Sequence, residues 1–132
     1  MGNFVHLHVH TEYSILDGAT KIAVAAKKAK ALGMPALAIT DHGNMYGAVN
    51  FFDACEKEGI KAIIGTEFYV CDDHTEKTGK PKLRHLVLLC KNEEGYKNIS
   101  LLNAIAFRDG FHYKPRIDLK TLAEHHEGLI CL

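Results

Sequence analysis

Short apolar stretches alternate with longer amphipathic ones along most of the chain. The apolar stretches predict strands at residues 3–9, 36–39, 60–64 with 68–70, 85–89 and 129–132. Helical spacing predicts helices at residues 21–32, 46–58, 93–107 and 118–126, the first capped by Thr20 and the last by Asp118. Short, nearly all-apolar strands separated by helices indicate an α/β fold with a mainly parallel sheet. This pattern suits an open doubly wound sheet and a closed barrel equally.

The chain length limits how much of such a fold is present. A (β/α) barrel usually needs about 250 residues, whereas this sequence has 132 residues and reaches its last apolar strand at residues 129–132. We therefore interpret residues 1–132 as a single domain that is the N-terminal portion of a barrel, with about five strands. A sheet edge left unpaired in this way predicts self-association.

Composition excludes several functional classes. Sixteen basic and sixteen acidic residues give a net charge of zero, so no overall positive charge favours nucleic acid, which leaves open a local basic patch. No apolar run approaches the roughly 20 residues that span a bilayer, and histidines interrupt the N-terminal stretch where a signal peptide would be apolar. The four cysteines are scattered, which is typical of reduced thiols in a cytoplasmic protein.

Histidine is the unusual residue, with nine copies, two of them in the first predicted strand and a third directly after it. Residues two apart in a strand share a face, so His6, His8 and His10 are expected to point the same way. Buried imidazoles need a partner, and a metal ion such as zinc is a natural one. Core hydrogen bonding is the alternative for His8 and His10, while His6 suits a supporting position as well as direct ligation.

Further polar residues follow the predicted strands, where βα proteins place their chemistry. They are Asp17, Asp41, His42 and Glu67. Each alone could be an ordinary loop residue, but together they are expected on one rim. Mixed histidine and carboxylate ligands suit zinc, manganese or iron, and a cluster of such ions suits phosphoester cleavage. His85 stands at the wrong end of its strand for this rim, and His74, His112, His125 and His126 are expected to face solvent.

The motifs that carry these residues resemble a known family. They are residues 6–18 (HLHVHTEYSILDG), 33–44 (GMPALAITDHGN), 59–61 (GIK), 65–67 (GTE), 85–86 (HL) and 92–98 (NEEGYKN). The chain resembles the polymerase and histidinol phosphatase (PHP) domain, and more narrowly the N-terminal region of bacterial DNA polymerase III alpha subunits. The resemblance covers essentially all 132 residues.

The resemblance implies a distorted seven-stranded (β/α) barrel with a trinuclear metal site of nine ligands. Six ligand positions are present: His8, His10, Asp17, His42, Glu67 and His85. The first five of these are the expected catalytic group, and His6 and Asp41 become supporting residues. Three further ligands are expected beyond Leu132.

The resemblance also implies a function. The site would hydrolyse phosphodiesters as a 3′→5′ exonuclease within a DNA-directed DNA polymerase, using zinc, manganese or iron. The expected partners are DNA, the rest of the alpha subunit and other replicase subunits, with no membrane. Two alternatives remain: a stand-alone phosphoesterase for small phosphate monoesters, and a non-catalytic docking module.

Overall fold

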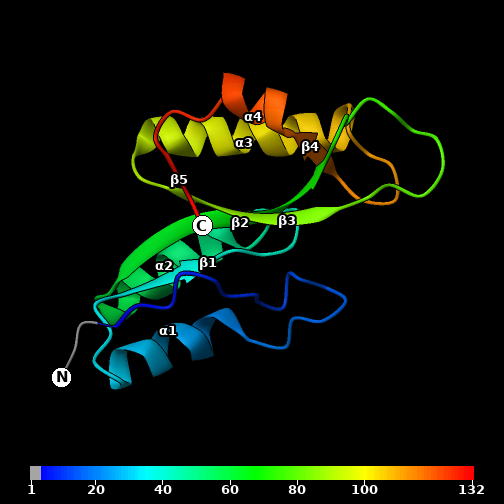
Figure 1. Ribbon diagram of the computed structural model, residues 1–132. Helices are drawn as coiled ribbons and strands as arrows, with labels where there is room; N and C mark the ends of the chain where they lie inside the picture. The colour runs from blue at the N-terminus through cyan, green and yellow to red at the C-terminus, as the bar shows by residue number, and fades with distance from the viewer. Residues whose placement is uncertain (1–3) are drawn as a thin grey trace.

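A five-stranded open sheet forms the centre of the chain in the computed structural model, which describes residues 4–132 (Figure 1). In chain order the elements are α1 (Ile22–Ala31), β1 (Ala36–Ile39), α2 (Ala48–Glu58), β2 (Lys61–Cys71), β3 (Arg84–Cys90), α3 (Glu93–Arg108), β4 (Arg116–Asp118), α4 (Leu119–Glu124) and β5 (Leu129–Cys131). The strands follow the order β1-β2-β3-β5, and β4 also pairs with β2. The predicted α/β class and the number of strands are confirmed, but β4 was not among the predicted strands, and the one predicted at the N-terminal end does not form.

The sheet is mixed, so the predicted mainly parallel arrangement is wrong. Strands β1 and β4 run parallel to β2, whereas β3 runs antiparallel to β2 and β5 antiparallel to β3. The reason lies in residues 72–83, a loop without a helix that joins β2 to β3. Parallel neighbours require a crossover, usually a helix, but antiparallel neighbours do not. The polar composition of this loop was the feature of the sequence that could have indicated an antiparallel pair.

Strand β2 is continuous, although a break was expected at residues 65–67. Gly65 lies inside the ladder opposite Leu89, and a side chain there would meet the carbonyl oxygen of Leu88 at 2.5 Å. Glycine therefore permits close approach of the β3 backbone rather than making a turn. As a consequence, Glu67 stands inside a long strand, fully supported by neighbours on both sides.

The histidine-rich segment, residues 4–10, is extended along β1 but forms no regular strand. The amides of Ala38 and Thr40 donate to the carbonyls of His6 (3.0 Å) and Val9 (2.8 Å). The amide of Val9 donates to the Thr40 hydroxyl at 2.8 Å instead of to a backbone carbonyl. This side-chain substitution breaks the ladder and explains why the predicted strand is absent; the Asn3 end of that prediction lies outside the described residues.

Helices cover the sheet in two groups, with α3 and α4 on one side and α1 on the other (Figure 1). One apolar core joins α1, α2 and β1 through residues such as Ile22, Phe51 and Leu37. A second core joins α3 to β2 and β3 through Ile99, Phe68 and other apolar residues. The candidate site lies where the segments of the first core meet β2 and β3.

The observed helix ends agree with the predicted ones in part. Gly59 adopts the left-handed conformation that ends α2, and the side chain of Asp118 caps α4 by accepting from the Thr121 amide, as predicted. Thr20 is not the cap of α1; Lys21 takes that position without a side-chain hydrogen bond. No helix in residues 4–132 has the length and apolar character to span a bilayer.

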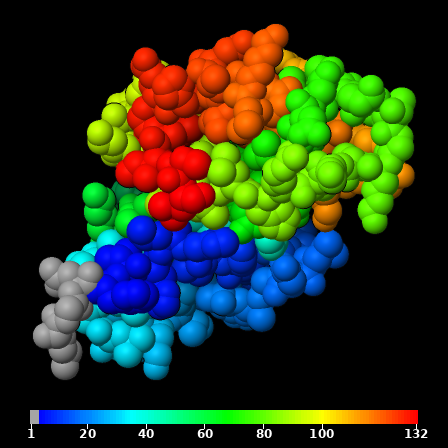
Figure 2. All heavy atoms as spheres, in the orientation of Figure 1, coloured from blue at the N-terminus to red at the C-terminus, as the bar shows by residue number. Residues whose placement is uncertain are grey.

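Strand β5 leaves one edge of the sheet available for pairing. It pairs with β3 on one side and ends the strand path, and the C-terminal segment lies on the surface of the molecule (Figure 2, red). Ile130 in this strand is 46% exposed. Because unpaired edges accept further strands, we expect the chain to elute earlier from a size-exclusion column as its concentration rises. Ile130→Lys should restore monomeric elution, whereas Leu119→Lys on α4 should not. Monomeric elution of the unmodified chain at every concentration would contradict this expectation.

Candidate metal centre

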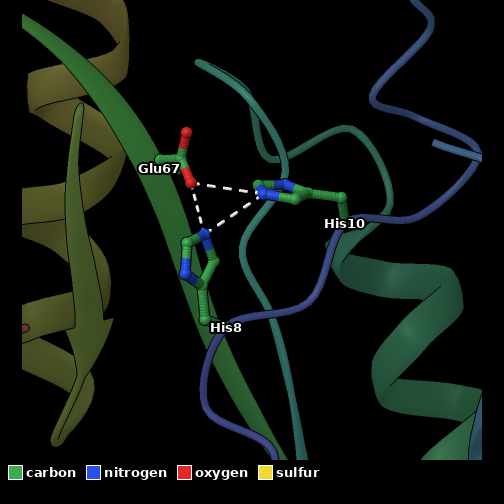
Figure 3. Close-up of side chains that lie close together, drawn as sticks. All are labelled: His8, His10 and Glu67. Carbon is green, nitrogen blue, oxygen red and sulfur yellow. Dashed lines mark hydrogen bonds and ion pairs between the residues drawn. The ribbon is translucent and has the colours of Figure 1, made fainter. Parts of the chain in front are cut away.

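Glu67 is surrounded by four histidines that come from three separate parts of the chain. Its Oε2 atom contacts Nε2 of His8 and lies 3.2 Å from Nε2 of His10 (Figure 3). Its Oε1 atom lies 2.9 Å from Nδ1 of His42 and 2.7 Å from Nδ1 of His85. Each oxygen of one buried carboxylate therefore faces a different pair of imidazoles.

The direction of β3 explains why His85 reaches this cluster. In the antiparallel register His85 lies opposite Tyr69, two residues beyond Glu67 on β2. The first residue of an antiparallel strand lies beside the later part of its neighbour, so the start of β3 meets the rim where β2 carries Glu67. The objection that His85 stands at the wrong end held only for a parallel strand.

His42 is fixed beside Glu67 by the backbone. The amide of Gly43 donates to the Glu67 carbonyl at 2.8 Å, and the Glu67 amide donates to the Asp41 carbonyl at 3.0 Å. The His42 ring stacks on His10, with centroids 4.0 Å apart. Burial lowers the pKa of His10, and the nearby His42 lowers it further, so His10 presents a neutral ring at neutral pH. A neutral imidazole is the form that binds a metal.

Asp17 lies at the outer end of the cluster. Its Oδ2 atom is 3.2 Å from Nε2 of His42, on the side of that ring opposite Glu67. It belongs to neither of the two groups whose ligand atoms all lie within 4.8 Å, which are His8, His10 and Glu67, and His42, Glu67 and His85. Five of the six predicted ligands thus converge closely, and Asp17 contacts them through His42.

Asp41 supports the loop that carries Asp17. Its buried carboxylate accepts hydrogen bonds from the Thr11 amide (2.6 Å), the Thr11 hydroxyl (2.7 Å) and the Ser14 hydroxyl (2.7 Å). The Ser14 hydroxyl in turn accepts from the His42 amide at 3.1 Å. These contacts agree with the supporting position expected for Asp41. Thr11 and Ser14 were not singled out in the sequence, since hydroxyl residues in loops are common.

His6 does not share the orientation of His8 and His10, contrary to the strand prediction. Its ring lies 4.7 Å from that of Phe4, edge to face, and lines a separate hollow together with Val9 and Lys28. In a regular strand His6 and Val9 would point to opposite faces. The irregular backbone of residues 4–10 removes that alternation, so His6 gives the cluster no side-chain contact in the described residues.

The polar atoms of the cluster are not satisfied by the described residues alone. His10 Nδ1, His42 Nδ1 and Glu67 Oε1 are buried without a hydrogen-bond partner in residues 4–132. His42 Nδ1 and Glu67 Oε1 are close in distance but not aligned for a hydrogen bond. Buried polar groups are rarely left unpaired, and four imidazoles around a carboxylate suit zinc, manganese or iron. The residues present therefore fit a metal.

A third group of residues of the kinds that bind metals, Asp73, His74 and Asp118, has a structural explanation. Burial raises the pKa of Asp118, but hydrogen bonds from the Thr121 amide and from the ring and amide of His74 outweigh it and hold the pKa well below its usual range. These bonds cap α4 and anchor the loop of residues 72–83. The expectation that His74 faces solvent is wrong, because this bond draws its ring inward.

The remaining histidines that were expected to face solvent differ among themselves. His126 is exposed, while His112 and His125 are half-buried. The His112 ring contacts the carbonyl of Gly79 at 2.7 Å, so it links two loops. The expectation that these histidines face solvent is therefore met by His126 and met in part by His112 and His125.

Comparisons with known proteins agree with this geometry. A sequence model of the PHP domain matches residues 6–132. The chain is 52% identical to DNA polymerase III subunit alpha of Treponema pallidum over 98% of its length, and 52% identical to that of Helicobacter pylori over 96%. It spans only 12% and 11% of those relatives. A solved amidohydrolase from Chromobacterium violaceum covers 79% of this chain and 34% of its own, with a TM-score of 0.53 and 22% identity, a likeness of fold.

Proposed function

We propose, because the chain belongs to the PHP domain family, that its histidine and carboxylate cluster binds divalent metals and hydrolyses phosphodiesters at the 3′ end of DNA. The observation that carries this proposal is the position of Glu67. Its two oxygens face separate histidine pairs, so each oxygen would join one pair in holding a metal. Multinuclear sites of this kind suit phosphoester hydrolysis.

The roles of the side chains follow from their contacts. His8, His10 and Glu67 Oε2 would hold one metal, and His42, His85 and Glu67 Oε1 a second. With the Asp17 carboxylate accepting a hydrogen bond from His42 Nε2, the Nδ1 atom of that ring would be the one that binds a metal. Metals bound here would lower the pKa of water and neutralise charge on the phosphate.

We further propose that the chain is a segment of a bacterial DNA polymerase III alpha subunit. Support comes from identities of 45–52% to alpha subunits of Aquifex aeolicus and Treponema pallidum over 98% of this chain. The rest of the subunit, DNA and other replicase subunits would then be its partners. This similarity favours the polymerase context over a stand-alone monoesterase.

The full-length subunit provides the test. We expect metal analysis to find bound zinc, manganese or iron, and the subunit to shorten a single-stranded DNA labelled at its 5′ end. His10→Ala should remove this shortening and leave nucleotide incorporation intact, because the polymerase chemistry would lie elsewhere. Absence of all three metals, or shortening unchanged in His10→Ala, would contradict a catalytic role and favour a docking module.

A further inference from the structure

A row of exposed aromatic side chains borders the candidate metal centre. The rings of Tyr46 and Phe107 have centroids 6.3 Å apart, and those of Phe107 and Phe111, which stack, are also 6.3 Å apart. Their exposed fractions are 60%, 40% and 49% in that order. Large exposed rings in a contiguous row usually mark a binding surface. We call Tyr46, Phe107 and Phe111 the aromatic row.

One cavity joins the aromatic row to the metal-type residues. It has a volume of about 340 Å³ and is lined by Asp17, His42 and His85 on the side of the centre, and by Tyr46 and Phe107 on the side of the row. A ligand that occupies this cavity would touch both. The row is therefore continuous with the site and is not a separate patch.

Lys114 supplies a positive charge in the same cavity. Its ammonium group lies 5.4 Å from the centre of the Tyr69 ring, within the range of a cation–π contact. The preceding residue, Tyr113, has φ of 61°, a left-handed conformation that is costly for a residue other than glycine. The His112 amide closes this turn by donating to the Lys114 carbonyl at 3.1 Å. This strained turn fixes Lys114 beside the cavity.

We propose that the aromatic row stacks the unpaired bases of a DNA strand while Lys114 binds its phosphate backbone, so that the strand is led to the metal centre. This inference rests on the proposed function and names the form of its substrate. Aromatic rings stack on any base, but a base inside a duplex has both faces covered by its neighbours. The row therefore selects single-stranded ends.

The charges around the cavity indicate that base stacking, and not charge attraction, is the main source of affinity for a DNA strand. The whole chain has no net charge, and Asp17, which is well exposed, would repel a phosphate when no cation is bound. The charge of Asp109, which lies between Phe107 and Phe111 in the sequence, is balanced by an ion pair with Arg108 that includes two hydrogen bonds. Lys114 is the cationic side chain that lines the cavity among the described residues. Ring stacking must therefore contribute most of the affinity.

Binding without metal separates this inference from hydrolysis. Fluorescence anisotropy with a labelled oligothymidylate, in EDTA at low salt, should show binding that a blunt duplex does not match. Tyr46→Ala and Phe107→Ala should each weaken it by about tenfold, the effect of one lost base stack. Phe52→Ala, an equally exposed ring on α2 outside the cavity, is the matched control. Lys114→Gln should weaken binding and make it less sensitive to salt.

Each outcome decides the inference. Equal binding of single strand and duplex, or unchanged affinity in both ring variants, would overturn it. Photocross-linking of a 5-iodouracil oligonucleotide to Tyr46 or Phe107 should locate the strand on the row, and cross-links confined to other surfaces would also overturn it. If the ring variants lose binding but added metal produces no hydrolysis, the strand-binding surface stands and the nuclease function fails.

Discussion

Glu67→Gln is expected to lower the affinity of the chain for zinc or manganese by more than about 100-fold, since outer partners of metal ligands alone are worth 10–100-fold. Glu67 is the residue shared by both candidate metal groups, so one change acts on both positions. Glutamine keeps the shape of the side chain but loses the negative charge and one acceptor oxygen. Isothermal titration of the metal-free chain with each ion measures the loss.

The control for this change is Glu56→Gln, an exposed glutamate in the last turn of α2 that is not part of the cluster. It removes the same charge from the chain and should leave metal affinity unchanged. Circular dichroism should show that both variants fold. Metal affinity that is equal in Glu67→Gln and the unmodified chain would show that the convergence of histidines on Glu67 does not form a metal site.

Local patterns predicted most elements but not the way in which the strands pair. Ala36–Ile39 and the helix that ends at Gly59 follow directly from an apolar run and a glycine stop. Gly65 was misjudged, because a glycine that makes a turn and one that admits a neighbouring backbone look alike in sequence. The difference depends on β3, which is contributed by residues far along the chain. Strand direction likewise depends on long-range pairing that periodicity does not encode.

More of the candidate site than of the strand pairing could be predicted from the sequence. Spacing brought His8 and His10 together, and its position after an apolar run singled out Glu67, although Glu67 lies inside β2 and not after the end of a strand. The role of His85 came only from family resemblance, since it required an antiparallel β3. Lys114 gave no signal, because a lysine between an aromatic residue and a proline is unremarkable until the loop folds over Tyr69.

Asp41→Ala is expected to destabilise the chain by about 3–5 kcal/mol, the usual effect of removing one partner from a buried, charged hydrogen-bond network. The Asp41 carboxylate is 1% exposed and accepts three hydrogen bonds from Thr11 and Ser14. Alanine would leave those three donors buried and unpaired. Urea unfolding should show a large fall in the midpoint with little change in slope.

Two further variants separate the network from simple loss of charge. Asp41→Asn keeps one acceptor oxygen and replaces the other with a donor that faces the Thr11 hydroxyl, so it should cost less than alanine but remain clearly destabilising. Asp53→Ala, on the exposed face of α2, should change stability by less than about 0.5 kcal/mol. Because Ser14 also holds the His42 amide, Asp41→Asn should weaken metal binding in addition to stability. Stability of Asp41→Ala equal to that of Asp53→Ala would mean that the loop of residues 11–17 is held by other contacts.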